Sequence, residues 1–427
     1  MKQNFVIKIK KPSQAEGLLW AILVLPFLFS TLIELLHLPN LIKYSCDIAW
    51  LWLLLLMYLQ RGRKTWEQRL FGLVIVGYLL FTAVGYVLNY QSLLYYLWGV
   101  RNNFRMFVVF LAVIAFCKET TRADFLKFFD SVFWINVALC VFQFFVLGRD
   151  QDNLGGIFGI EKGCNGYLNN YFVIVAIKSI LEYLYARDTL TDCVMKCGAM
   201  LLISVLAELK YFYVEFVVII VMAVLLTDFS WKKVLVIVGG FAGVILTARL
   251  LIALFPEFEG FFSLGAMLEA ASSDRGYTNT GDINRLNAVA VISRRFLKTW
   301  PEQLVGMGLG NCDTSGFAFL VSPFYHKYYE LNYTWFTTAF TFLETGYVGL
   351  IFLFGFFVLV FFRAGAVAKR RPQDKTYCQM AQIGAVCCAM IAIYNSTLRN
   401  EAGYMLYIIL ALPFIRNLNS AEERRLT

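Results

Sequence analysis

The chain has 427 residues, of which 59% are hydrophobic and only 16% are charged. A soluble globular protein usually carries about 25% charged residues, so this composition excludes a secreted enzyme, a disordered chain and a cytosolic oxidoreductase. The formal net charge of +9 does not indicate a nucleic-acid partner, because the cations follow the pattern of membrane topology. The sequence therefore predicts an integral membrane protein.

Long apolar blocks recur along the chain and do not alternate with polar residues, which favours helices over a barrel. A helix needs about 20 apolar residues to cross a bilayer. Twelve spans are predicted, with ten or eleven as alternatives because the fourth and the seventh are short. They are residues 18–37, 41–59, 70–89, 104–117, 129–147, 169–186, 194–208, 211–227, 233–254, 334–361, 378–396 and 402–416. The predicted fold class is an all-α polytopic membrane protein.

The Lys and Arg residues predict the orientation of these spans. Cationic loops stay in the cytoplasm, and the loops on the same side as the N-terminus carry most of the Lys and Arg. Both termini are therefore predicted in the cytoplasm. The first apolar block follows a basic leader but has no small-residue cleavage site, so we interpret it as a retained helix and not as a signal peptide.

One predicted connection is far longer than the others and lies on the outer face. Long ordered loops are usually functional, so we treat this loop as a part of its own. It divides the chain into three parts. Residues 1–255 carry about nine spans, residues 256–333 form the extracytoplasmic loop, and residues 334–427 carry the last three spans and a cytoplasmic tail.

Residues 282–300 of this loop carry apolar side chains at mostly helical spacing. Asp282 is a candidate N-cap and Pro301 would stop the helix, so we expect an amphipathic helix that lies at the membrane interface. Arg285 would then occupy the first turn, where a cation opposes the helix dipole. Its side chain is expected to have another partner.

Five cations are predicted at the outer ends of spans or in the outer loops. They are Arg101 and Arg105, which flank the start of the fourth span, Lys210 between the seventh and eighth spans, Arg285, and Arg399 in a short turn. Each alone could be a snorkelling surface residue, and Lys210 could simply pair with Glu208 in a tight turn. Together, Lys210, Arg285 and Arg399 form a candidate diphosphate clamp, because cationic forks match phosphate oxygens.

Other residues could orient or activate a substrate. His326 is either an interfacial residue or a base for an incoming hydroxyl. Glu344 lies within the tenth span and would need a cation partner or a polar cavity. Tyr325, Tyr328 and Tyr329 are candidates for stacking on sugar rings. Because the chain has two histidines and no Cys-x-x-Cys motif, neither a metal site nor a cofactor is predicted.

Several of these segments resemble motifs of the Wzy-type polysaccharide repeat-unit polymerases and the related O-antigen ligases. The likeness covers roughly residues 150–350. The segments that carry it are residues 152–159, 207–210, 284–286, 300–301, 306–310, His326, 344–346 and Gly349. Lys210 stands where ligases carry an arginine, and Lys327 follows His326 where ligases often have asparagine. Both departures suit a polymerase better than a ligase.

The resemblance implies a GT-C-like bundle and a metal-independent glycosyltransferase in the bacterial cytoplasmic membrane, acting in capsule or exopolysaccharide synthesis. It would transfer the growing glycan from undecaprenyl diphosphate onto a lipid-linked repeat unit at the outer face. Arg285, His326 and Glu344 would be catalytic. Lys210, Arg285 and Arg399, with Arg101 and Arg105, would hold the diphosphate.

The expected partners are the undecaprenyl-diphosphate-linked oligosaccharide and membrane lipid, with a flippase and a chain-length regulator as further candidates. Two other functions stay open. An O-antigen ligase would use the same chemistry with a different acceptor. A flippase or transporter for the lipid-linked glycan would suit twelve helices, but transporters usually place their charges along a cavity at the membrane midplane.

Overall fold

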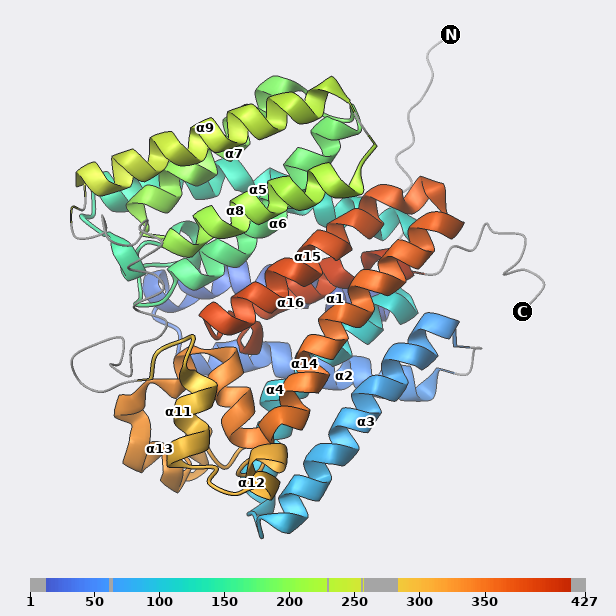
Figure 1. The fold of residues 1–427 in the computed structure, drawn as a ribbon, viewed down its shortest axis with the longest axis vertical. Coiled ribbons are helices and arrows are strands. Elements are labelled where there is room, and N and C mark those ends of the chain that lie inside the picture. Colours follow the sequence, from blue (N-terminus) through green and yellow to red (C-terminus); the bar gives the residue numbers. More distant parts are fainter. Residues whose placement is uncertain (1–12, 61–63, 229, 255, 257–282, 416–427) are drawn as a thin grey trace.

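The computed structural model describes residues 13–60, 64–228, 230–254, 256 and 283–415, and these residues form helices and connections without a strand. The long helices are α1 (Gln14–Ser30), α2 (Ser45–Leu59), α3 (Trp66–Leu88), α4 (Leu93–Phe116), α5 (Glu119–Phe145), α6 (Asn165–Leu184), α7 (Leu190–Leu206), α8 (Lys210–Leu226), α9 (Trp231–Leu254), α14 (Thr337–Arg370), α15 (Lys375–Tyr394) and the shorter α16 (Gly403–Ala411). They pack side by side, and the short helices α11 (Ala288–Arg295), α12 (Trp300–Val305) and α13 (Pro323–Tyr328) gather near the start of α14 (Figure 1).

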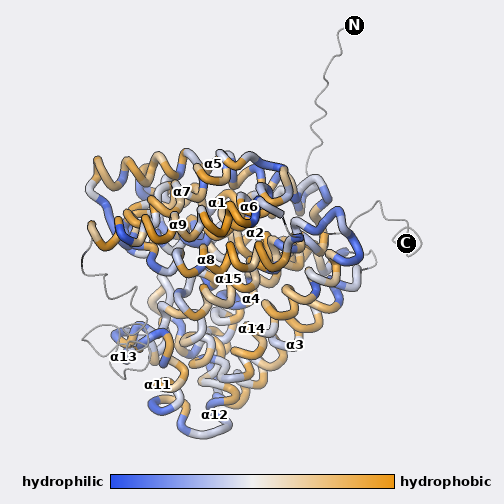
Figure 2. The backbone as a smooth tube through the Cα atoms, turned by 45° about the horizontal axis from the view of Figure 1, so that its top comes forward, coloured by the Kyte–Doolittle hydropathy of each residue, from blue (hydrophilic) through white to orange (hydrophobic). Residues whose placement is uncertain are grey.

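Eight helical segments in the described part of the chain are long and apolar enough to cross a membrane. They are Gln14–Leu35, Asn40–Leu59, Trp66–Leu88, Leu93–Phe116, Glu119–Phe145, Trp231–Leu254, Thr337–Arg370 and Pro372–Tyr394. Apolar residues follow the middle of most helices, whereas polar residues collect at helix ends and around α11–α13 (Figure 2). The chain is thus helical and multi-pass in character. Helices α6, α7, α8 and α16 overlap the other predicted spans, so twelve crossings remain a prediction.

Three helices form the centre of the bundle. Helix α16 is buried along its whole length, and it contacts both α6 and α15, which are themselves largely buried. By contrast, α9 lies at the edge, and only Lys233, Val236 and Leu251 of its side chains are buried. Outward-facing leucines such as Leu73 and Leu225 are more than 70% exposed in the protein alone. Such surfaces suit contact with lipid.

The predicted start of the fourth span is wrong. Helix α4 begins at Leu93, more than two turns before Arg101. Ser92 precedes the helix as its N-cap residue, and serine is among the residues preferred there. Arg101 and Arg105 therefore lie inside a helix of 24 residues and do not flank its start.

The predicted amphipathic helix is shorter than residues 282–300. Asp282 lies outside the described residues, and Arg285 lies in a turn before α11, not in its first turn. The buried positions of α11, Ala288 and Ile292, are four residues apart and share one face. Pro301 lies in the first turn of the next helix, α12, instead of ending the first one, because proline fits the first turn of a helix, where its missing N–H is not needed.

Candidate functional site

A cavity of about 670 Å³ lies among helix ends that come from distant parts of the sequence. Its lining is drawn from residues 26–34, 151–169, 208–211, 335–336 and 394–400, together with Lys43 and Arg285. The topology predicted from the Lys and Arg residues would place these segments at the outer side of the membrane. The cavity therefore brings the end of α1, the start of α6, the turn between α7 and α8, and the end of α15 to one place.

Two of the predicted diphosphate ligands, Lys210 and Arg285, line this cavity together. The Arg285 guanidinium carbon lies 4.1 Å from the centre of the Tyr394 ring and 5.2 Å from that of Phe336. Tyr394 in turn stacks on Tyr211, with 4.0 Å between ring centres and 2° between planes. Arg285 therefore has the further partners expected of it, and these are aromatic faces, which attract a guanidinium and favour a parallel, stacked arrangement.

Lys210 lies in a tight turn that also faces the cavity. Its Nζ lies 3.7 Å from Oε2 of Glu208, whose backbone has a positive φ of 49°. Burial lowers the pKa of Lys210, and the positive charge of Arg285 lowers it further, although Glu208 acts in the opposite direction. Both interpretations of this segment are thus compatible: the ion pair shapes the turn, and the turn presents the ammonium group beside a second cation. An anion bound here would relieve that repulsion.

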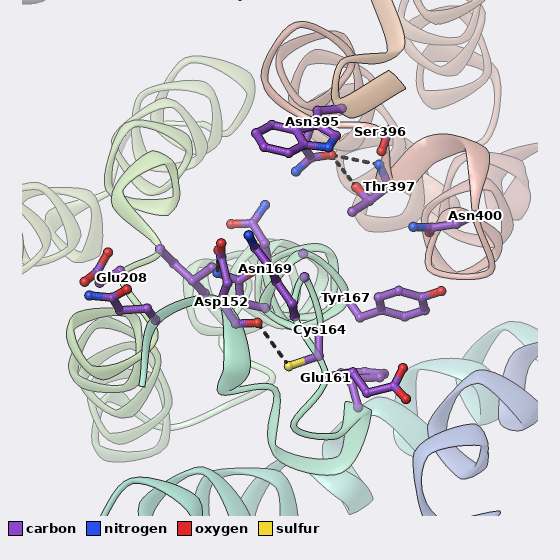
Figure 3. A pocket seen from close by; sticks show the side chains of 18 of the residues that line it. Asp152, Glu161, Cys164, Tyr167, Asn169, Glu208, Asn395, Ser396, Thr397 and Asn400 are labelled. Atoms are coloured by element: carbon purple, nitrogen blue, oxygen red, sulfur yellow. Dashed lines mark hydrogen bonds between the residues drawn. The ribbon is translucent and has the colours of Figure 1, made fainter. Parts of the chain in front are cut away.

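Polar side chains form much of the remaining lining. Asn395, Ser396 and Thr397 lie together on one side of the cavity, and Asp152, Asn169 and Glu208 lie on another (Figure 3). The Asn395 Oδ1 atom accepts hydrogen bonds from the Thr397 backbone N–H at 2.9 Å and from its hydroxyl at 2.6 Å. Amides, hydroxyls and exposed aromatic rings are the groups that recognise sugars.

The cavity also contains carboxylates that the sequence interpretation did not select. Asp152 and Glu161 both line it (Figure 3), and Asn165 donates to Asp152 Oδ1 at 3.0 Å. A third, Glu34, accepts the Ile160 N–H at 3.1 Å and so holds the chain at the rim. Asp152 is the first residue of segment 152–159, which resembles a Wzy-type motif, and this resemblance was the one indication in the sequence that Asp152 belongs to the site. Nothing in the sequence indicated that Glu34, more than a hundred residues away, would join it.

Arg101 and Arg105 do not line the cavity. Arg101 donates to Asp47 from Nε at 3.1 Å and from Nη2 at 2.5 Å. Arg105 is 3% exposed, and its Nη1 donates to Glu401 Oε1 at 2.8 Å. Tyr167, which does line the cavity, donates its hydroxyl to the other Glu401 oxygen at 3.0 Å. Arg105 thus supports the cavity wall from behind, through Glu401 and Tyr167. The structure does not bring Arg101 or Arg105 to the cavity as the diphosphate hypothesis expected.

Glu401 should make this supporting network sensitive to acid. Burial raises the pKa of Glu401, but the charge of Arg105 and its hydrogen bond lower it more, to about 2. A lowered pKa in the folded state contributes stability above the unfolded-state value of about 4.5, and this contribution is lost as the pH falls towards 2. We expect Glu401→Gln to cost on the order of 3 kcal/mol near pH 7, measured by thermal melting in detergent.

The melting-temperature difference between wild type and Glu401→Gln should shrink steadily as the pH is lowered from about 5 to about 2. Asp124→Asn is a matched control, because Asp124 pairs with Lys127 at 3.9 Å on the surface, where such a pair contributes less than about 1 kcal/mol. A Glu401→Gln deficit that is independent of pH would contradict the assignment.

Arg399 and Glu344 lie close together, away from the cavity lining. Nη2 of Arg399 is 3.6 Å from Glu344 Oε2 and 3.5 Å from Asp313 Oδ2. Asn102 donates to the same Asp313 oxygen at 2.6 Å, and the Arg399 guanidinium lies 3.5 Å from the centre of the Phe340 ring. Glu344 therefore has the cation neighbour that its full burial requires. Arg399 is not brought together with Lys210 and Arg285 as the clamp hypothesis expected.

Glu344 also anchors the glycine-rich segment of residues 306–310. Its Oε1 accepts the N–H groups of Gly310 at 2.9 Å and Cys312 at 3.3 Å, and its backbone carbonyl accepts the N–H of Gly308 at 3.0 Å. Two residues later Gly346 interrupts α14 with a φ of 61°. A carboxylate of the protein thus occupies the N–H groups that a phosphate-binding loop would offer to its ligand. Glu344 acts here as a structural anchor, a role that the sequence interpretation missed.

His326 and the three tyrosines lie elsewhere, on α13 and just after it, and none of them lines the cavity. Tyr328 packs edge to face against Phe296 and at a tilt against Phe324, with ring centres 5.0 and 4.7 Å away. His326 and Tyr329 are exposed to solvent, and Tyr325 packs partly against the same apolar cluster. The structure therefore does not bring these residues to Lys210 and Arg285.

In comparisons with known proteins, no protein-family model matches the chain and no curated protein matches it significantly.

Proposed function

We propose that the protein is a membrane glycosyltransferase that polymerises lipid-linked repeat units, moving the growing glycan from undecaprenyl diphosphate onto a new repeat unit at the outer face of the bacterial cytoplasmic membrane. The observation that carries this proposal is the meeting of Lys210 and Arg285 in one cavity of about 670 Å³. A space of this size accommodates a diphosphate and adjoining sugars. The Wzy-like motifs at residues 207–210 and 284–286 contribute these two cations.

The proposed reaction needs stabilisation of a leaving group. The bond between the anomeric carbon and the diphosphate oxygen breaks, and the diphosphate departs with the bonding electrons. Lys210 and Arg285 stabilise the charge that develops on it, since preorganised cations act most strongly where charge appears in the transition state. The stacking on Tyr394 holds Arg285 in position before the substrate arrives.

The same reaction needs a group that takes a proton. The acceptor hydroxyl oxygen forms the new bond to the anomeric carbon and releases its proton. His326 was the residue expected to accept it, but it lies outside the cavity lining. The lining carboxylates Asp152 and Glu161 are better placed, because a general base must come within hydrogen-bond reach of the proton.

The membrane itself supplies much of the substrate binding. Both substrates carry lipid tails that stay in the bilayer beside the apolar helix surfaces, so the cavity has only to orient the sugars and the diphosphate. Exposed aromatic residues of the lining, such as Trp335, suit stacking on sugar rings.

Purified protein in liposomes with a lipid-linked repeat unit tests the proposal directly. With EDTA present and no nucleotide added, we expect a ladder of products spaced by one repeat unit on a gel. Heat-inactivated protein in the same liposomes is the control. A single unchanged band from folded protein would reject the polymerase. Transfer to an added lipid A-core acceptor would then indicate a ligase, and movement of the lipid-linked glycan between leaflets would indicate a flippase.

A further inference from the structure

A buried carboxyl group lies behind the wall of the cavity. Glu215 of α8 is 0% exposed, and its Oε2 accepts a hydrogen bond of 2.9 Å from Nδ2 of Asn169 in α6. Its Oε1 has no hydrogen-bond partner, and its carboxyl group forms no ion pair, within the part of the chain that the structure describes. Burying such a group is costly, so packing alone does not explain a glutamate here.

The hydrogen bond to Glu215 fixes the direction of the Asn169 amide. An asparagine amide has a donor end at Nδ2 and an acceptor end at Oδ1. Because Nδ2 donates to Glu215, Oδ1 is the end left for a ligand, and among the described residues no group donates to it. Asn169 lines the cavity (Figure 3). A carboxyl group accepts a hydrogen bond whether or not it is protonated, so this orientation does not depend on the charge of Glu215.

Another amide of the lining has the opposite polarity. Asn395 Oδ1 is occupied by the backbone N–H and the hydroxyl of Thr397, which leaves Nδ2 of Asn395 as a donor. A sugar hydroxyl both donates and accepts hydrogen bonds. One oriented acceptor at Asn169 and one oriented donor at Asn395 therefore match the hydroxyls of a glycan better than they match a second anion.

We propose that Glu215 is a positioning residue, which holds Asn169 so that its Oδ1 accepts a hydrogen bond from a glycan hydroxyl in the cavity. The inference rests on the proposed function, because it names a further substrate-binding residue of the same site. Glu215 does not touch the substrate. Its effect is transmitted through Asn169 alone, which makes the two residues a testable pair.

Initial rates of elongation in liposomes, at varied concentrations of the lipid-linked repeat unit, test this pair. Asn169→Leu and Glu215→Leu should each raise KM about tenfold, as expected for one lost hydrogen bond, with little change in kcat. The double variant should be no worse than either single variant, because both remove the same contact. Glu215→Gln keeps an acceptor oxygen for Asn169 and should retain the wild-type KM.

Thermal melting of each variant separates binding from folding. An unchanged KM in a folded Asn169→Leu variant would overturn the inference about Asn169 and Glu215. The proposed function would still stand in that case, provided that the wild-type protein elongates the glycan. Additive effects in the double variant would overturn the link through Asn169. If Glu215→Leu does not fold, Glu215→Met, which also offers Asn169 no acceptor oxygen, takes its place, and Asn169→Leu still tests the contact with the glycan. A wild-type protein that elongates nothing would reject the proposed function and this inference with it.

Discussion

Arg285→Ala should reduce elongation about 100-fold or more, the range seen when one preorganised group is removed from a developing negative charge. Arg285 lines the cavity beside Lys210 and lies over the Tyr394 ring, so alanine removes both the charge and the stacked side chain. Long polymer should disappear, both in liposomes and in cells that depend on this protein. Gel analysis of product length, at equal protein abundance in the membrane, measures the effect.

Two further variants make the Arg285 result specific. Arg285→Lys keeps a charge but loses the planar fork and the stacking, so its activity should lie between wild type and alanine. Arg295→Ala is the matched control, because Arg295 is exposed on the neighbouring helix α11 and does not line the cavity. Normal chain length from Arg285→Ala would remove this residue from the site.

The sequence was sufficient to predict a helical, multi-pass protein, because each apolar block indicates a helix by its own composition and length. The length of such a block predicts a helix without knowledge of its neighbours. The sequence was less informative where contacts between distant residues decide where a helix begins or ends. Helix α4 extends back to Leu93 across the polar residues 101–103, where Arg101 and Asn102 find partners in Asp47 and Asp313. A hydropathy pattern contains no record of such partners.

For the candidate site, the sequence interpretation selected Lys210 and Arg285, which line one cavity, but grouped them with three arginines that do not line it. Charge and depth alone cannot separate a cation that faces a cavity from one that pairs with a distant carboxylate. Arg105 and Glu401 are almost three hundred residues apart in the sequence, and Asn102 and Asp313 are more than two hundred residues apart. The glycine-rich segment of residues 306–310 likewise depends on Glu344, which lies on another element.

The second large effect is expected where the glycine-rich segment of residues 306–310 contacts α4. Gly310 has a φ of +90°, and an added Cβ would lie 1.9 Å from the backbone oxygen of Tyr95. On the other side of the contact, a Cβ on Gly99 would lie 2.5 Å from the Gly310 nitrogen. The atoms on both sides of this contact belong to the backbone, so they cannot move aside as the end of a flexible side chain could. Gly310→Ala should therefore displace the loop, break the hydrogen bond to Glu344 and cost about 3 kcal/mol or more.

Because the loop holds Cys312, its displacement can be observed directly. The Cys312 side chain is 0% exposed, so a membrane-impermeant maleimide should label it in Gly310→Ala and leave it unlabelled in the wild type, as measured by peptide mass spectrometry. The melting temperature should fall by about 3 to 4 °C. Gly72→Ala in α3 is the matched control, since its Cβ would meet open space and alanine favours a helix by up to about 1 kcal/mol. A Gly310→Ala protein that melts like the wild type, with Cys312 still protected, would show that the loop does not depend on this close backbone contact.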